Sequence, residues 1–379
     1  MKPFEGMRRQ KEAGKPVIGC FPLYPPVELF HSMGLAPVIL WGLTCSVHDA
    51  DRHVQSYVCS IARRLAQLVM TENDLFDGIF FYNACDTLRN LPEILREGLN
   101  ASDKVAPRMF RLHVPMVPTE QTDSSDYLAN EIQNLIDALE DAYGMNFSEE
   151  KFAQSVLLNR KARALCMRLE DAVSQGKASF SEFCDTLMSA NFLPVDEQIE
   201  LLEAKTAALE VSEASKVDDH RVIVSGILPP PPKVNKLIDE AGLRVVGNDI
   251  AAFRRSYAHT PETWTDAYDY YLHFYRDHFP CTTLLYSADR RIEEILKMTE
   301  EHKADGFLFI GEKFCEYEYF ELPYLEGRLK ERGISVLAIE ISMEDDATAE
   351  TYRTRIEAFT EMLAAGKSAA GGVTTKQGV

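Results

Sequence analysis

The residues of this sequence best suited to chemistry are cysteines, and their spacing leaves two explanations open. The chain of 379 residues contains eight of them: Cys20, Cys45, Cys59, Cys85, Cys166, Cys184, Cys281 and Cys315. No two form a Cys-x-x-Cys pair, which disfavours a zinc site. Thiolates that converge from distant parts of a chain can instead form a soft-ligand site for a metal. The alternative is that each cysteine is a buried packing residue, which is common for this residue type.

Several of these cysteines lie where parallel sheets bind ligands. Three of them close or follow predicted strands: Cys20, Cys85 and Cys315. In open α/β sheets, ligands bind outside the carboxyl ends of the strands. Cys59 falls inside a predicted helix over residues 51–70, whereas Cys166 and Cys184 look like packing residues of a helical segment. Thiols from these positions could converge in one site, but spacing alone leaves a metal site and plain packing both open.

Two polar residues near the first strand ends are candidate catalytic residues. Glu28 and His31 lie, with Trp41, close to the ends of the first two predicted strands. Strand ends are where α/β sheets expose side chains to a ligand. The ordinary alternative for His31 is a histidine on a helix face without a catalytic role.

Short apolar runs alternate with amphipathic stretches and predict an α/β protein with parallel sheets. The predicted strands cover residues 16–20, 37–41, 76–82, 108–113, 221–225, 243–246, 282–285, 306–310 and 334–339. The main predicted helices cover residues 26–33, 51–70, 87–96, 233–241, 290–303 and 349–364. We expect two doubly wound, Rossmann-like or flavodoxin-like domains over residues 1–122 and 219–365. A helical layer over 123–218 links them, and a tail over 366–379, rich in small residues, is expected to be disordered.

An internal sequence similarity indicates that the two domains share the same topology. Residues 75–86 read LFDGIFFYNACD, and residues 303–316 read KADGFLFIGEKFCE. Each segment contains an Asp-Gly turn, an apolar strand and a cysteine followed by an acidic residue. Chance similarity between two parallel strands is the alternative.

Composition and missing motifs exclude several functional classes. The formal net charge of −19 disfavours binding to nucleic acid or to an anionic membrane. No apolar run approaches the ~20 residues needed to span a bilayer, and the first residues lack the apolar core of a secretory signal. We therefore expect a cytoplasmic protein. The Gly-x-Gly-x-x-Gly, Walker and Gly-x-Ser-x-Gly motifs are absent, so we expect that the chain itself binds no nucleotide.

Six motifs follow one another along residues 17–363. They are IGCFPLYPPVELFHSMGLAPVILWG (18–42), QSYVC (55–59), CDTLR (85–89), VVGND (245–249), ADGFLFIGEKFC (304–315) and RTRIEAF (353–359). In this order the chain resembles the small iron–sulfur subunits of the benzoyl-CoA reductase and 2-hydroxyacyl-CoA dehydratase superfamily. Any one of the motifs alone would be weak support.

The resemblance implies that Cys59, Cys85 and Cys315 ligate one 4Fe-4S cluster. Cys20 matches a cysteine of the dehydratase-like small subunits, and the resemblance implies that it is a fourth ligand or a near neighbour of the cluster. Relatives with a double-cubane cluster carry a pair of cysteines near the position of Cys281. This chain has one cysteine there, so a single cubane is expected.

The resemblance also implies an activity on acyl-CoA thioesters. One electron added to the thioester carbonyl of a 2-hydroxyacyl-CoA gives a ketyl radical anion, which can expel the hydroxyl group. Reduction of an aromatic acyl-CoA ring likewise needs electrons at low potential, which iron–sulfur clusters can supply. A larger homologous iron–sulfur subunit and a separate ATP-hydrolysing iron–sulfur activator are the implied partners. The task of the protein is to hold the cluster, exclude water and position the thioester.

The reaction type stays open between a reductase and a dehydratase. The segments at residues 55–59 and 89–91 favour a benzoyl-CoA reductase, which is the expectation here, whereas residues 18–22 and the region of Cys281 favour a dehydratase. The acyl group is also open, because Glu316-Tyr-Glu stands where relatives have Asp-Pro-Glu. A non-catalytic scaffold, a structural zinc protein of the same fold and a stand-alone homodimeric redox protein are further alternatives.

Overall fold

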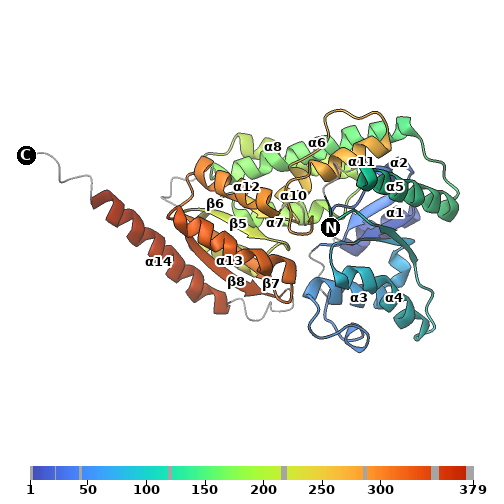
Figure 1. Cartoon of the computed structure of the whole chain (residues 1–379), viewed down its shortest axis with the longest axis horizontal. Helices are drawn as coiled ribbons and strands as arrows, with labels where there is room; N and C mark the ends of the chain where they lie inside the picture. Colours follow the sequence, from blue (N-terminus) through green and yellow to red (C-terminus); the bar gives the residue numbers. More distant parts are fainter. Residues whose placement is uncertain are drawn as a thin grey trace, which may run out of the picture.

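The chain folds into two parallel sheets joined by long helices (Figure 1). The computed structural model describes residues 3–21, 23–41, 45–117, 122–214, 220–284, 288–342 and 350–372. The first sheet consists of β1 (Val17–Cys20), β2 (Ala36–Ile39), β3 (Gly78–Tyr82) and β4 (Arg108–Leu112). The second sheet consists of β5 (His220–Gly226), β6 (Leu243–Ile250), β7 (Gly306–Glu312) and β8 (Ser335–Ile341).

The two sheets have the same strand order, and the predicted α/β fold class is confirmed. All strand pairs are parallel, in the orders β2-β1-β3-β4 and β6-β5-β7-β8. β1, β3 and β7 are buried along their whole length, as expected for strands covered on both faces. β3 and β7, the strands of the two similar segments, hold the same place in the two sheets. The two domains are thus built on one plan.

Helices surround the first sheet and continue into a linking layer. The helices around the first sheet are α1 (Pro3–Glu12), α2 (Val27–Ser32), α3 (Ser60–Thr71) and α4 (Asp86–Asn100), with the short 3-10 helices η1 (Ala50–Arg52) and η2 (Asn73–Leu75). The linking layer consists of α5 (Thr122–Tyr143), α6 (Glu149–Ser174), α7 (Phe180–Ala190) and α8 (Val195–Glu210). α6 contacts α2 on one side and β6 on the other, so it connects the two sheets (Figure 1).

The remaining helices follow the strands of the second sheet. They are α9 (Pro232–Glu240), α10 (Arg254–Tyr257), α11 (Ala267–Arg276), α12 (Ala288–Glu301), α13 (Glu316–Glu331) and α14 (Glu350–Gly372). α11 packs on α5 of the linking layer, near α2 (Figure 1). The domain boundaries given above therefore stay a prediction, since this segment crosses between the layers. Among the helices that the structure describes, none combines the length and the apolarity needed to cross a membrane.

Three expected elements differ from the structure. The strand predicted over 282–285 was wrong, because residues 282–284 form a turn closed by the bond from Leu284 N–H to the carbonyl of Cys281, while residue 285 lies outside the described ranges. The helix predicted over 51–70 begins only at Ser60, because Cys59 has the extended backbone of an N-cap. The last helix continues past residue 364 to Gly372, which includes part of the predicted tail, and residues 373–379 lie outside the described ranges.

A buried ionic network joins α2, α6 and α11. Glu28 is fully buried, and its Oε1 lies 2.5 Å from Nη2 of Arg163 in α6. The hydroxyl of Tyr270 donates to Oε1 of Glu28 at 2.9 Å, and that of Tyr271 donates to Oε2 at 3.4 Å. The Tyr271 hydroxyl also accepts the backbone N–H of Leu29 at 3.1 Å. These contacts fix the first domain against the linking layer and the segment that follows β6.

We predict that Arg163→Leu will lower the free energy of unfolding by about 3–5 kcal/mol, because it leaves the Glu28 carboxylate buried without its partner. Arg168→Leu on the same helix is the control, because Arg168 and its partner Glu210 are both more than half exposed. Its expected cost is within about 1 kcal/mol. Urea unfolding of both variants measures the difference, and equal losses would contradict the role given to Glu28.

Candidate functional site

Three of the candidate cysteines occupy the same structural position, the N-cap of a helix. Cys59 precedes α3, Cys85 precedes α4 and Cys315 precedes α13. Cys85 follows β3 and Cys315 follows β7, so equivalent strands of the two sheets each carry one thiol. Cys85 contributes to the pKa of Cys59, and both contribute to the pKa of Cys315. The structure therefore brings three thiols from two domains together.

Side-chain hydrogen bonds shape the loops that carry Cys59 and Cys85. Oε1 of Gln67 accepts the backbone N–H groups of residues 48, 49 and 50 at 2.8, 2.8 and 3.2 Å. This contact folds the segment ahead of Cys59 back on α3. Asn83 donates to the carbonyl of Val114 at 3.1 Å and accepts its N–H at 2.9 Å, which fixes the chain between β3 and Cys85.

The backbone directly before Cys315 is strained. Phe314 has a φ of 67°, in the left-handed region that bulky residues rarely adopt, and its side chain is 47% exposed. The exposed Phe314 side chain therefore gains little packing that could offset the backbone strain. Strain of this kind is concentrated at functional sites, and here it sets the direction in which Cys315 begins α13.

Burial and helix ends act on the three thiols in opposite directions. Burial raises the pKa of Cys59 to about 12 and raises the pKa values of Cys85 and Cys315 as well. Backbone N–H groups in the first turns of α3, α4 and α13 lower all three pKa values, since the N-terminus of a helix favours negative charge. Metal binding would supply the rest of the stabilisation that the thiolates need.

Two buried carboxyl groups flank the thiols. Oε1 of Glu312, at the end of β7, accepts the backbone N–H of Ser60 at 2.7 Å. This bond runs from the second domain to the start of α3 in the first. Oε2 of Glu318 accepts the N–H of Glu312 at 3.0 Å. Burial raises the pKa of Glu312 to about 8 and that of Glu318 to about 7. Glu312 thus caps the helix that Cys59 begins.

Three cysteine thiols are the kind of donor set that holds an iron–sulfur cluster. In the part of the chain that the structure describes, no three His, Cys, Asp or Glu side chains lie close enough to share one ion. A cluster instead spreads its cysteine ligands over several iron atoms, so that the ligands lie further apart. Three positive helix ends also suit a group of negative charge.

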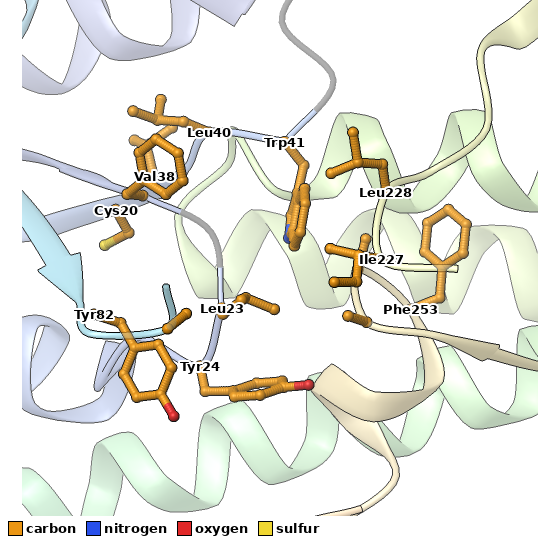
Figure 2. Close-up of a cluster of buried hydrophobic side chains, with 14 of the residues drawn as sticks. Cys20, Leu23, Tyr24, Val38, Leu40, Trp41, Tyr82, Ile227, Leu228 and Phe253 are labelled. Carbon is orange, nitrogen blue, oxygen red and sulfur yellow. The ribbon is translucent and has the colours of Figure 1, made fainter. Parts of the chain in front are cut away.

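Cys20 has a different environment from the three helix-end thiols. It is fully buried at the end of β1, in the hydrophobic cluster of Figure 2, and its Sγ is 3.7 Å from the carbonyl oxygen of Ile18. Burial raises the pKa of Cys20, and no other thiol contributes to that shift. Its role as a cluster ligand stays a prediction. Cys184 is buried in α7, where a packing residue was predicted.

Cys281 belongs to a second buried group. Nη1 of Arg255 and Oγ1 of Thr283 each lie 3.3 Å from its Sγ. Burial is the largest influence and raises the pKa of Cys281, but the Arg255 guanidinium and the hydrogen bonds from Thr283 and Tyr24 together leave the pKa below its ordinary value. Asp249 holds the same guanidinium at 2.8 Å from Nε.

The contacts of the two predicted catalytic residues are with residues other than the three helix-end cysteines. Both oxygens of Glu28 are engaged by Arg163, Tyr270 and Tyr271, which supports a positioning role. His31 lines a pocket beside β2, and burial lowers its pKa. The catalytic roles of both residues stay predictions.

Glu312, Glu318 and Gln67 are site residues that the sequence pattern did not identify. The two glutamates stand three residues on either side of Cys315, and this symmetric spacing was the available signal. Their burial and the bond from Ser60 to Glu312 depend on the meeting of two domains, which no local pattern encodes.

The chain is similar over almost its whole length to acyl-CoA enzyme subunits. It is 25% identical over 369 residues to the (R)-phenyllactyl-CoA dehydratase beta subunit of Clostridium sporogenes, covering 94% of each chain. It is 27% identical over 371 residues to the (R)-2-hydroxyglutaryl-CoA dehydratase beta subunit of Acidaminococcus fermentans, covering 94% of this chain and 95% of the relative. It is 24% identical over 375 residues to one of the benzoyl-CoA reductase subunits of Thauera aromatica, covering 95% of this chain and 94% of the relative.

A family model described as 2-hydroxyglutaryl-CoA dehydratase, D-component, matches residues 22–363, which include all three helix-end cysteines. The match extends over both sheets and the linking layer. The chain therefore belongs to the 2-hydroxyglutaryl-CoA dehydratase D-component family, within the superfamily that its motifs indicate.

Proposed function

We propose that this chain is the beta-type iron–sulfur subunit of a 2-hydroxyacyl-CoA dehydratase, with one 4Fe-4S cluster held by Cys59, Cys85 and Cys315. The observation that carries the proposal is the meeting of these thiols at three helix N-termini from two domains. Two of the three relatives named above are dehydratase beta subunits, which favours a dehydratase over the reductase expected from the sequence.

The protein's own residues bind, shield and orient the proposed group. When bound, a 4Fe-4S cluster supplies electrons at low potential. The thiols ligate it, and the N–H groups of α3, α4 and α13 stabilise its negative charge. Glu312 fixes the start of α3 against β7, so that Cys59 and Cys315 keep their separation.

Benzoyl-CoA reductase is the second candidate. The reductase relative from Thauera aromatica resembles this chain over nearly the same length as the dehydratase relatives do. The two reactions differ in electron demand, because a dehydratase recovers its electron in each turnover and a reductase consumes two. Counting the reductant consumed per product formed by the assembled enzyme distinguishes them.

We further propose that the chain works in the cytoplasm with a larger homologous iron–sulfur subunit. The name "beta subunit" of two relatives implies a partner subunit in those proteins, which supports the proposal. Electrons reach the pair from a separate ATP-hydrolysing iron–sulfur activator, and the substrate is an acyl-CoA thioester.

We predict that protein purified without oxygen contains about four iron and four sulfide per chain, as expected for a 4Fe-4S cluster. Cys85→Ala and Cys315→Ala are expected to lose most of both, because each removes a ligand from a different domain. Cys184→Ala is the control, since this thiol is buried in α7. Iron and sulfide analysis on folded variants, checked by circular dichroism, measures the outcome.

Two results would decide against parts of this proposal. A folded parent protein without iron would overturn the cluster itself. Cys20→Ala tests the fourth predicted ligand: loss of iron would make Cys20 a ligand despite its place in the core, and retention would make it a packing residue.

We predict that Glu312→Ala will hold its cluster less firmly than Glu312→Gln. The glutamine keeps an oxygen that can accept the Ser60 N–H, whereas alanine leaves this donor without its partner at the domain interface. The rate of iron release to a chelator is expected to rise several-fold for alanine and to stay near the parent rate for glutamine. Equal rates in both variants would show that the Glu312 cap does not fix the site.

A further inference from the structure

Helix α13 has two apolar faces, of which one is packed within the chain. Leu325 and Leu329 are buried where α13 contacts β7, β8 and α12, and Figure 1 shows the helix in front of the second sheet. Phe320 and Tyr324, four residues apart, stand on another side of the helix and are 77% and 56% exposed. A helix at a protein surface ordinarily turns polar residues to solvent. Two large aromatic rings on one exposed helix face therefore point to a contact outside the chain.

The same side of α13 contains two residues that are unfavourable inside a helix. Pro323 lies in the interior of α13, Gly327 follows about one turn later, and both are exposed. Proline removes a helical hydrogen bond, and glycine is the poorest helix former after proline. A Cβ at Gly327 would meet no heavy atom of the described residues within 4 Å, so crowding within the chain does not require a glycine there. A glycine on an open helix face instead lets a second backbone approach closely.

We call Phe320, Pro323, Tyr324 and Gly327 together the outward face of α13. The spacing of these residues places them within two turns of the helix and on one side of it.

Tyr324 is held in position within the free chain. Nη1 of Arg328 donates to the Tyr324 hydroxyl at 3.1 Å, and Nη2 of the same arginine donates to Oε1 of Glu293 in α12 at 3.0 Å. The guanidinium is therefore paired with a carboxylate, and the ring that it holds loses little conformational freedom when a partner binds. A fixed aromatic side chain that a partner covers is a typical anchor of a protein interface.

The outward face lies beside the three-thiol site. Cys315 is the N-cap of α13, and at a rise of about 1.5 Å per residue Phe320 and Tyr324 stand about 8 and about 14 Å from it along the axis. Tyr57, two residues before Cys59, is 66% exposed as well. A protein that covers the outward face therefore also comes close to the group that the thiols hold, which is where electrons have to enter and leave.

The chemistry of the outward face fits a permanent partner subunit better than a transient electron donor. Along this side of the helix, charged residues stand only at the two ends, Glu316 and Glu331. Permanent interfaces are more apolar than the small interfaces of transient electron transfer. Aromatic residues are enriched in interfaces, whereas Lys and Glu are depleted. An uncharged face also lets this chain, with its net charge of −19, meet another protein without repulsion.

We propose that the outward face of α13 is the docking surface of the larger homologous subunit, which lays an apolar segment on Phe320 and Tyr324 and packs closely at Gly327. The inference rests on the proposed function, because that function supplies the partner. The names of the two dehydratase relatives, which are beta subunits, support a permanent partner.

The test is analytical ultracentrifugation, without oxygen, of this chain with the larger homologous subunit of the same organism, produced together with it. Phe320→Lys is expected to weaken association at least about tenfold, because it places a charge in an apolar interface. The lysine can pair with Glu316 four residues earlier, so α13 is expected to stay intact. Hydrogen exchange over residues 316–331 is expected to slow when the parent chain binds the larger subunit.

Gly327→Leu separates docking from folding. Leucine is a better helix former than glycine and meets open space there, so the melting temperature of the isolated chain is expected to stay the same or to rise. Its bulk is expected to weaken association at least about fivefold, because it keeps the partner's backbone away. A residue with a role in folding alone would not give this combination.

Leu157→Lys is the matched control, because Leu157 is 57% exposed on α6 and stands outside the outward face. It should bind the larger subunit as the parent does. Phe320→Lys, Gly327→Leu and Leu157→Lys should all contain as much iron as the parent, which keeps this inference distinct from the cluster itself.

Four results would overturn the inference. Parent-like association of both Phe320→Lys and Gly327→Leu would remove the outward face from the interface and leave the proposed function intact. Failure of the parent to bind the larger subunit would overturn the inference together with the proposed partner, but not the cluster. Self-association of the isolated parent that Phe320→Lys abolishes would assign the face to a second copy of this chain. A Phe320→Lys complex that assembles like the parent but is no longer reduced by the activator would assign the face to the activator.

Discussion

The geometry of the three-thiol site depends on how rigidly two separate sheets are held together. Cys59 and Cys85 begin helices of the first domain and Cys315 begins a helix of the second, yet the sheets share no strand. Their relative position rests on contacts that are costly to break. Glu28 and Arg163 form a buried pair whose loss leaves an uncompensated charge, and Glu312 bonds directly to the start of α3. These buried ionic contacts therefore keep the three thiols at fixed positions relative to one another, although the Glu28–Arg163 pair lies away from the thiols.

The two domains have the same strand order, and this explains why Cys85 and Cys315 occupy equivalent positions. The two domains nevertheless contribute different groups to the site. Cys85 and Cys315 follow equivalent strands, β3 and β7. Cys59 and Cys281 also correspond, since each stands between the second and third strands of its half. Only Cys59 is a helix N-cap, whereas Cys281 faces the Arg255 guanidinium, which Asp249 holds. One half thus supplies two thiols to the site and the other supplies one thiol and a carboxyl cap, Glu312.

The sequence predicted much of this arrangement, and its failures have physical reasons. The apolar runs and the similarity between residues 75–86 and 303–316 were sufficient to predict two parallel sheets of the same topology. The reason is that buried parallel strands consist of continuous apolar runs. The helix start at Cys59 was missed because Gln67 folds the preceding segment by side-chain bonds that leave no periodic signal. The predicted strand after Cys281 was wrong because the bond from Leu284 to Cys281 closes a turn there. Glu28 was predicted as a catalytic residue, and its contacts in the structure are with Arg163 and two tyrosines rather than with the thiols.

The charge that a buried site of this protein can bind depends on the helix ends and side chains around that site, rather than on the net charge of −19. Three helix N-termini face the thiols and oppose the cost of their burial, and an arginine does the same for Cys281. Salt screens surface carboxylates over a distance of about 8–10 Å, whereas buried dipoles and cations are screened much less. An acidic protein can therefore present positive potential at its interior sites, which is the condition that a negatively charged group such as a thiolate-bound cluster requires.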